Sequence, residues 1–294
     1  MPRLEVLKTY KIFIAGKFPR TESGRYYIAE NKKGDKLANV CLSSRKDFRD
    51  AVIAARSAFN DWGSRAAFNR SQVLYRIAEM LEGRKAQFID ELMKQDSTKE
   101  QAEKEVSLSI ERLIYYAGWC DKFQQLYSTV NPVASSHFNF SAPEPTGVVS
   151  IIAPQNNSLI GLVSVIAPII AGGNTCVVLA SASKPLCAVT FAEVLGTSDV
   201  PGGTINILTG KPGELLSWFS DHMDVNAIVF CKNDKEAILK IQQKATLNLK
   251  RVLLWNNYNW LLETAQNPYL INDAQEIKTT WHPIENIGGA KAGY

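Results

Sequence analysis

Two side chains that could do chemistry together stand next to each other at Cys231 and Lys232. A cysteine thiolate is a nucleophile, and a neighbouring ammonium group favours the thiolate over the thiol. Cys231 also follows an apolar run that ends at Phe230, and cysteines are among the residues most often buried. We therefore expect Cys231 to be a structural cysteine at a strand end, with an activated thiol as the alternative.

Other chemical motifs are incomplete. Gly210-Lys211 matches the end of a phosphate-binding loop, but the first glycine of that motif falls on Ile205, and Pro212 replaces its Ser or Thr. The histidines and cysteines show no zinc-ligand spacing, so we predict no metal site. The five cysteines are odd in number and scattered, which indicates reduced thiols in a cytoplasmic protein.

Composition narrows the classes of partner. The net charge of +4 is spread over 294 residues without a basic run, so we expect neither nucleic acid nor a membrane surface as a partner. The first residues, Met1 to Glu5, lack the layout of a signal peptide. The apolar run from Leu159 to Ala171 is short for a membrane span and contains Pro168, which favours a buried helix.

The elements that must position any site lie between Pro145 and Leu216. Short apolar runs alternate there with helical patterns and with polar or Gly-rich turns. Such alternation indicates crossover units of a buried parallel sheet, whose ligand sites lie where strands end. The expected strands are 147–153, 175–179 and 204–208, and the expected helices are 159–171 and 185–195. Pro154 to Ser158 is the polar turn after the first strand.

This stretch resembles the aldehyde dehydrogenase superfamily. The residues that carry the resemblance are Pro145-Thr146-Gly147-Val148-Val149, Ala153-Pro154-Gln155-Asn156, Ala167-Pro168, Ala171-Gly172-Gly173-Asn174-Thr175 and Pro201-Gly202-Gly203 with Asn206. The sequence of residues 14–25 more specifically resembles the truncated second module of the two-module aldehyde dehydrogenase family 16. The resemblance implies an open α/β, Rossmann-like domain with a parallel sheet and a small β appendage for oligomerisation.

Ahead of this stretch, residues 8–42 predict short strands and hairpins, including 12–17 and 21–25. Ser44 to Asp47 reads as a capping box that opens a helix. Apolar residues then recur at helical spacing through 73–81 and 88–93, and a longer helix is expected from Val106 through Tyr127. Residues 136–141 alternate as a strand that the resemblance assigns to the oligomerisation hairpin, with an ordinary edge hairpin as the alternative.

The resemblance also implies roles for single residues. Asn156 falls on the asparagine whose amide stabilises an oxyanion, although a plain turn residue is the alternative. The positions that hold the cofactor ribose fall on Leu179 and Ala182, which are apolar. The phosphate-side turn falls on Cys231 and Lys232, where the permissive glycine is lost. We therefore expect no cofactor, the family's own being NAD or NADP.

The catalytic groups of the family have no counterpart after this point. Trp255 stands where the general-base glutamate is expected and cannot abstract a proton. Only 39 residues follow Trp255, and none is a cysteine. The tail from Lys278 to Trp281 and from Gly288 to Gly293 resembles the end of the family. The sequence therefore predicts that the catalytic domain is missing.

These expectations give a cofactor-type domain at 1–132 and 150–262, with an oligomerisation hairpin and tail at 133–149 and 263–294. The expected function is a catalytically inactive structural subunit, in a homo-oligomer or with a full-length aldehyde dehydrogenase chain. The alternative is an NAD(P)-dependent aldehyde oxidoreductase that shares a site with a partner carrying the cysteine. The apolar residues 253–255 and 258–262 either stay exposed as a docking surface or fold back into the cleft.

Overall fold

The short apolar runs form one parallel sheet in the computed structural model, which describes residues 6–284. Its strands are β6 (Val148–Ile152), β7 (Thr175–Leu179), β8 (Ile205–Leu208), β9 (Ala227–Phe230) and β10 (Arg251–Leu254), in the order β10-β9-β6-β7-β8. All neighbouring strands in it are parallel. The first three strands confirm the sequence expectation. The order reverses beside β6, because β7 and β8 extend the sheet on one side, and β9 and β10 extend it on the other.

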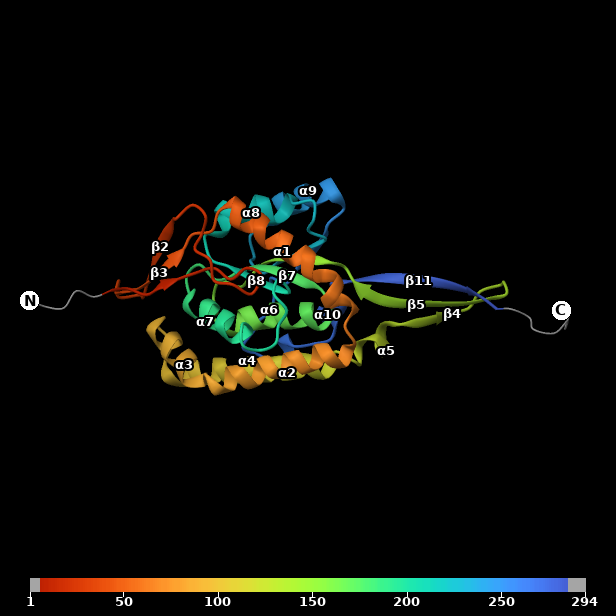
Figure 1. Ribbon diagram of the computed structural model, residues 1–294, viewed down its shortest axis with the longest axis horizontal. Helices are drawn as coiled ribbons and strands as arrows, with labels where there is room; N and C mark the ends of the chain where they lie inside the picture. The colour runs from red at the N-terminus through yellow and green to blue at the C-terminus, as the bar shows by residue number, and fades with distance from the viewer. Residues whose placement is uncertain (1–5, 285–294) are drawn as a thin grey trace, which may run out of the picture.

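Helices cover both faces of this sheet (Figure 1). One face carries α1 (Arg45–Ser64), α8 (Pro212–Asp221) and α9 (Lys235–Ala245). The other face carries α6 (Ile160–Ala171) and α7 (Leu186–Leu195), with α2 (Ala67–Gly83), α3 (Lys85–Lys94), α4 (Lys99–Trp119) and α10 (Tyr269–Asn272) packed around them. Every residue of α6 is buried, so this helix forms the centre of the core, as expected for an apolar helix that is covered on all sides.

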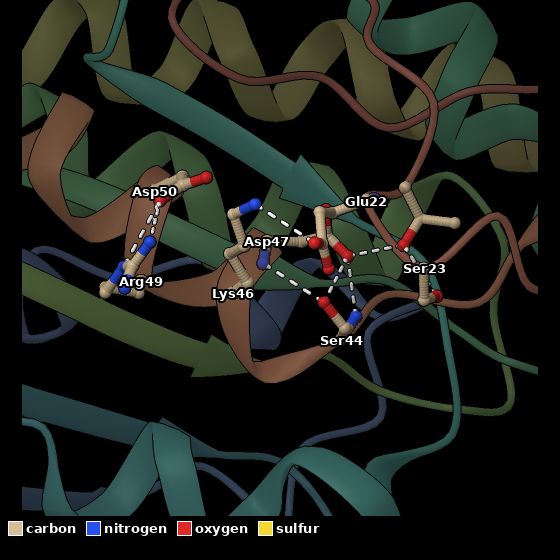
Figure 2. A network of polar contacts seen from close by, with 8 residues as sticks. Glu22, Ser23, Ser44, Lys46, Asp47, Arg49 and Asp50 are labelled. Atoms are coloured by element: carbon tan, nitrogen blue, oxygen red, sulfur yellow. Dashed lines mark hydrogen bonds and ion pairs between the residues drawn. The ribbon is translucent and has the colours of Figure 1, made fainter.

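The predicted capping box at the start of α1 is confirmed (Figure 2). The hydroxyl of Ser44 accepts a hydrogen bond from the Asp47 backbone N–H at 3.3 Å, and Asp47 Oδ2 accepts from the Ser44 backbone N–H at 2.7 Å. Asp47 Oδ1 also accepts from the backbone N–H of Glu22, so the same carboxylate anchors the preceding loop to the helix. The cap therefore fixes both the start of α1 and the path of the chain into it.

One predicted helix is divided in the structure. The pattern from Val106 through Tyr127 forms α4 and then the short α5 (Phe123–Tyr127), with a turn at residues 120–122. The N–H of Cys120 turns back to the carbonyl of Ala117, which tightens the last turn of α4. Apolar spacing did not reveal this break, because Cys120 and Phe123 are both buried on the same core.

The N-terminal strands form a separate small sheet. It has the order β1-β3-β2 and consists of β1 (Thr9–Tyr10), β2 (Tyr26–Glu30) and β3 (Lys36–Cys41). The strand, turn and hairpin expected within 12–17 are present as a minimal form, in which Ile14 and Lys17 pair across a tight turn through backbone hydrogen bonds of 3.0 and 2.9 Å. Phe13 forms an isolated bridge to Ile207 and so ties this segment to the edge of the large sheet.

A third sheet projects from the body of the molecule (Figure 1). It is antiparallel, has the order β11-β5-β4 and consists of β4 (Thr129–Asn131), β5 (His137–Pro145) and β11 (Gln275–Pro283). We call it the appendage sheet. The expected alternation in 136–141 is present, but the buried members are the polar Asn139 and Ser141. Their side chains bond to Asn131 of β4 and Thr279 of β11, so cross-strand polar pairs decide which face is covered.

The division expected from the sequence, 1–132 and 150–262 against 133–149 and 263–294, remains a prediction. Val148 and Val149 lie in β6 of the large sheet, and Leu270 and Ile271 of α10 are buried in the main core. The expected element from Gly288 to Gly293 lies outside the described residues. Within residues 6–284, no helix is long and apolar enough to cross a membrane.

Candidate functional site

A hollow of about 570 Å³ lies at the carboxyl ends of β6, β9 and β10. It is lined by the loops that follow these three strands, residues 154–157, 231–233, 256 and 258–261. This is the edge at which the strand order reverses, and open parallel sheets place their ligand sites at such a point. The hollow brings together Asn156, Cys231 and Lys232, which the sequence singled out, but not Leu179 or Ala182.

Asn156 is exposed on the wall of this hollow, in the turn between β6 and α6. Asn157, Asn233 and Asn256 line the same space, and none of these four carboxamides makes a side-chain hydrogen bond to another residue in 6–284. A free carboxamide offers two donors and one acceptor. The carboxamide of Asn156 is therefore available for hydrogen bonding, and its expected role at an oxyanion remains a prediction.

Gln155 bridges the turn after β6 to the turn after β7. Its Oε1 accepts a hydrogen bond of 2.9 Å from the backbone N–H of Ala182, and its Nε2 donates to the carbonyl of Ala153 at 2.8 Å. The hydroxyls of Ser181 and Ser183 donate to the Gln155 carbonyl at 3.0 and 2.8 Å. The two turns are thereby closed on each other.

This bridge falls on the positions that the resemblance aligned with ribose binding. Leu179 is buried within β7, and the N–H of Ala182 is already used by Gln155. Neither side chain has a group that could hydrogen-bond a ribose hydroxyl. The residues present here do not fit the sugar of a nicotinamide dinucleotide.

Cys231 follows β9, and its backbone N–H donates to the Ile152 carbonyl at 3.2 Å. Cys231 is partly exposed toward the hollow, but the surrounding protein desolvates its thiol and raises its pKa, so the side chain stays protonated near neutral pH. These findings support the structural interpretation of Cys231 over the activated nucleophile.

The start of α9, next to the same hollow, is occupied by a carboxylate. Asp234 is the N-cap, and its Oδ1 accepts a hydrogen bond of 3.1 Å from the Ala237 N–H. A helix N-terminus attracts anions, and here the protein supplies its own. A phosphate group would therefore meet a negative charge at the site to which the resemblance assigns it. Asp234 before Lys235-Glu236 is a helix-start signal that could have been recognised in the sequence.

The chain after β10 folds back over the core. Trp255 and Trp260 are each 3% exposed, and the indole Nε1 of Trp255 donates to Asp273 Oδ2 at 3.0 Å. Tyr258 stacks on Trp260 with ring centroids 5.0 Å apart. Leu261 and Leu262 remain 37% and 52% exposed. The tryptophans fold back as one alternative expects, whereas Leu261 and Leu262 face solvent, and a docking role for them remains a prediction.

Arg112 of α4 holds this segment in place. Its Nε donates to Gln266 Oε1 at 3.1 Å, and its Nη2 donates to the carbonyls of Trp260 and Leu262, both at 3.3 Å. Its Nη1 donates to the hydroxyl of Ser164 on α6 at 2.6 Å. Burial lowers the pKa of this guanidinium. The role of Arg112 could not be predicted from the sequence, because a single arginine on an amphipathic helix is ordinarily a solvent-exposed residue.

A larger hollow of about 760 Å³ lies elsewhere, between α1, α2 and the base of the appendage sheet. Its buried polar residues cap the end of α6, since Arg70 Nε donates to the Ala171 carbonyl and Gln275 Nε2 donates to the Gly172 carbonyl. These contacts give Arg70 and Gln275 structural roles. No group of three or more metal-ligating side chains is found within residues 6–284.

Comparison with known proteins gives the same fold. The model of the aldehyde dehydrogenase family matches residues 19–256. Cytosolic 10-formyltetrahydrofolate dehydrogenase of Mus musculus is 32% identical over 258 residues, which are 86% of this chain and 29% of that protein. The mitochondrial 10-formyltetrahydrofolate dehydrogenase of Homo sapiens is 32% identical over 251 residues, 83% of this chain and 27% of that protein.

Solved structures of aldehyde dehydrogenases show the same fold. The aldehyde dehydrogenase of Bacillus cereus, solved in complex with NAD+, superimposes with a TM-score of 0.79 at 26% identity. It covers 84% of this chain, while this chain covers 50% of it. The chain thus spans half or less of each relative described here. With its parallel α/β sheet and a family match over most of its length, the chain belongs to the aldehyde dehydrogenase family.

Proposed function

We propose that this chain is a catalytically inactive member of the aldehyde dehydrogenase family that acts as a structural subunit. One observation carries the proposal: residues 255–274 lead from β10 back over α4 and α6 and directly into β11. Trp255 stands where the resemblance expects the catalytic base, and its indole is committed to Asp273. This direct path from β10 to β11 supports the absence of a catalytic domain between them.

The chemistry of the cysteines supports this proposal. Covalent catalysis of the family type needs a thiolate and a base beside it. Cys41, Cys120, Cys176 and Cys187 are buried, and burial raises the pKa of Cys120, Cys176, Cys187 and Cys231. No carboxylate is among the described residues that line the hollow beside Cys231. Free thiols also fit the reducing cytoplasm, which we propose as the location.

The contacts at the turns support a loss of cofactor binding. The Gln155 bridge closes the ribose side, and Asp234 occupies the phosphate side. The Gln155 bridge and the Asp234 cap lie in separate loops, and each disfavours the binding of a different part of the dinucleotide. We propose that neither NAD nor NADP binds to this chain.

The appendage sheet is the surface proposed for pairing. Val130 and Phe138 are 68% and 46% exposed, and Phe140 lies opposite Val130 and has its ring 5.6 Å from that of Phe138. Exposed apolar residues gathered on one face of a sheet mark an interaction surface. We propose that this face pairs with a second copy of the chain or with a full-length aldehyde dehydrogenase chain.

Light scattering after size exclusion tests the pairing. The expected result is a dimer or larger species at micromolar concentration, which Phe138→Lys converts to a monomer. Phe68→Lys on α2, where the native side chain is 64% exposed, is the matched control and should leave the mass unchanged. A monomeric wild-type chain that does not change mass on mixing with an aldehyde dehydrogenase of the same cell would refute the pairing.

Asn156 favours one other candidate, an oxidoreductase that shares its site with a partner chain. Its carboxamide is exposed and unbonded among the described residues, as an oxyanion donor must be. In that case, aldehyde-dependent NADH formation would require both chains and would fall on Asn156→Ala. Activity of the mixture that is independent of Asn156 would rule out this candidate.

A further inference from the structure

The hollow at the carboxyl ends of β6, β9 and β10 carries hydrogen-bonding groups that the protein itself does not use. Asn156 and Asn157 follow β6, Asn233 follows β9, and Asn256 follows β10. Their four carboxamides come from three loops and line one space, yet none of them has a side-chain partner in residues 6–284. Together they offer both donors and acceptors, so they suit a ligand whose groups do both.

The charge around the hollow is balanced. Lys232 is the one charged residue among those lining it in the described part of the chain. Asp234, two residues further along, supplies a negative charge at the start of α9. A cation would find no carboxylate in this part of the lining, and an anion would gain one lysine but approach the Asp234 charge. The surroundings therefore favour a ligand without net charge.

An aromatic pair forms another part of the lining. Tyr258 is half-buried and stacks on the buried Trp260 with an interplanar angle of 28°. The face of an aromatic ring packs well against the C–H groups on one side of a puckered sugar ring, while amides bond the hydroxyls around its edge. The volume of about 570 Å³ accommodates one such ring with solvent but is closed toward β7 by the Gln155 bridge.

We propose that this hollow binds an uncharged, polyhydroxylated molecule the size of one sugar ring. Asn156, Asn233 and Asn256 would bond its hydroxyls, and Tyr258 would cover one of its faces. This binding would involve no covalent step and no nicotinamide cofactor. It goes beyond the pairing function, because it does not depend on the appendage sheet.

The test is isothermal titration of the full chain with glucose, ribose, ribose 5-phosphate and NAD. A ligand with so few atoms bonded through neutral amides is expected to bind with a dissociation constant on the order of millimolar. Glucose or ribose should therefore give saturable binding, ribose 5-phosphate should bind no more tightly than ribose, and NAD should not bind. A titration followed by ligand-observed NMR provides an independent measurement of the dissociation constant for such weak complexes.

Variants locate the site. Asn233→Ala and Asn256→Ala should each weaken sugar binding about fivefold, since each removes one neutral hydrogen-bonding group. Asn60→Ala, an exposed residue on α1 that does not line this hollow, is the matched control and should bind as the wild type does. Lys232→Met should leave binding of the neutral sugar within about twofold, because no charge is recognised. Thermal melts of each variant check that the fold is intact.

Three outcomes would overturn the proposal. One is the absence of saturable sugar binding, and another is sugar binding that Asn233→Ala and Asn256→Ala leave unchanged. The third is tighter binding of ribose 5-phosphate that Lys232→Met abolishes, which would assign the hollow to anions instead. Micromolar binding of NAD would contradict both this proposal and the proposed loss of cofactor binding. The pairing experiment with Phe138→Lys does not depend on any of these binding measurements.

Discussion

Trp255 Nε1 lies 3.0 Å from Asp273 Oδ2, so the residue at the expected position of the catalytic base is a hydrogen-bond donor to a partly buried carboxylate. Burial raises the pKa of Asp273, while the bond from Trp255 and the charge of Arg251 oppose that rise. The pair links the end of β10 to the start of β11. Trp255, at the expected position of the catalytic base, thus helps to hold the segment that leads from β10 back to β11.

Replacing Trp255 by Phe should lower the free energy of unfolding by about 2–4 kcal/mol, because a hydrogen bond to a charged group is lost and the smaller ring leaves a void at a buried site. Chemical denaturation measures this loss. Trp281→Phe is the control, since Trp281 is 56% exposed on β11 and makes no hydrogen bond through its indole within residues 6–284. Equal stability of both variants would show that the Trp255–Asp273 bond contributes nothing.

Arg112→Met should release the segment that folds back over the core. The substitution leaves Ser164, Gln266 and two backbone carbonyls without their donor, and each buried group left unpaired costs about 1–3 kcal/mol. Hydrogen exchange should accelerate in residues 256–266, with little change in β6 and β7. Arg76→Met on the exposed side of α2 is the control and should leave the exchange pattern as it was. Unchanged protection in 256–266 would contradict the role given to Arg112.

Gly147→Ala should be strongly destabilising. Gly147 has φ +134°, and a Cβ at this position would collide with Asn226 Oδ1, which itself accepts a hydrogen bond from the Val148 N–H. We expect a loss of about 2–4 kcal/mol, because both the backbone conformation and the bonded amide must shift. Gly213→Ala in α8 is the matched control, since no atom lies within 4 Å of its Cβ, and it should be neutral or slightly stabilising. A Gly147→Ala protein as stable as the wild type would contradict the strain expected at that turn.

Lys250 should make the free energy of unfolding depend on pH in the alkaline range. Its ammonium donates to the His222 carbonyl at 2.8 Å, and burial lowers its pKa from 10.5 to about 8. Between these two values the unfolded chain binds more protons than the folded chain, so the wild type gains stability as pH rises through this window. The gain relative to Lys250→Met should reach a few kcal/mol by about pH 10.

Urea denaturation of the wild type and Lys250→Met across this pH range provides the measurement. The exposed Lys240 on α9 supplies the control, since Lys240→Met should shift stability equally at every pH. Parallel stability curves for the wild type and Lys250→Met would show that Lys250 has the same pKa in the folded and unfolded chain.

Local sequence patterns are sufficient to predict the type and place of most elements around the site. The strands at 175–179 and 204–208 and the helix at 159–171 are mostly apolar runs, and glycines stand close to the latter two, at Gly203, Gly210, Gly172 and Gly173. Local patterns of this kind indicate burial, because a strand that is covered on both faces carries apolar side chains on both faces. Ser44 with Asp47 likewise identified the start of α1, since a capping box is complete within four residues.

Which side chains meet in the site depends on packing between segments that are far apart in the sequence. Gln155 reaches Ala182, and Arg112 reaches Trp260 and Leu262, which lie 148 and 150 residues further along the chain, through contacts that no local pattern encodes. The strand order that places β9 beside β6, and so brings Asn233 and Asn256 to Asn156, is also set by packing between distant segments. The covered face of β5 depended on its neighbours, because cross-strand pairing with Asn131 and Thr279 outweighed the apolar side chains of the strand itself.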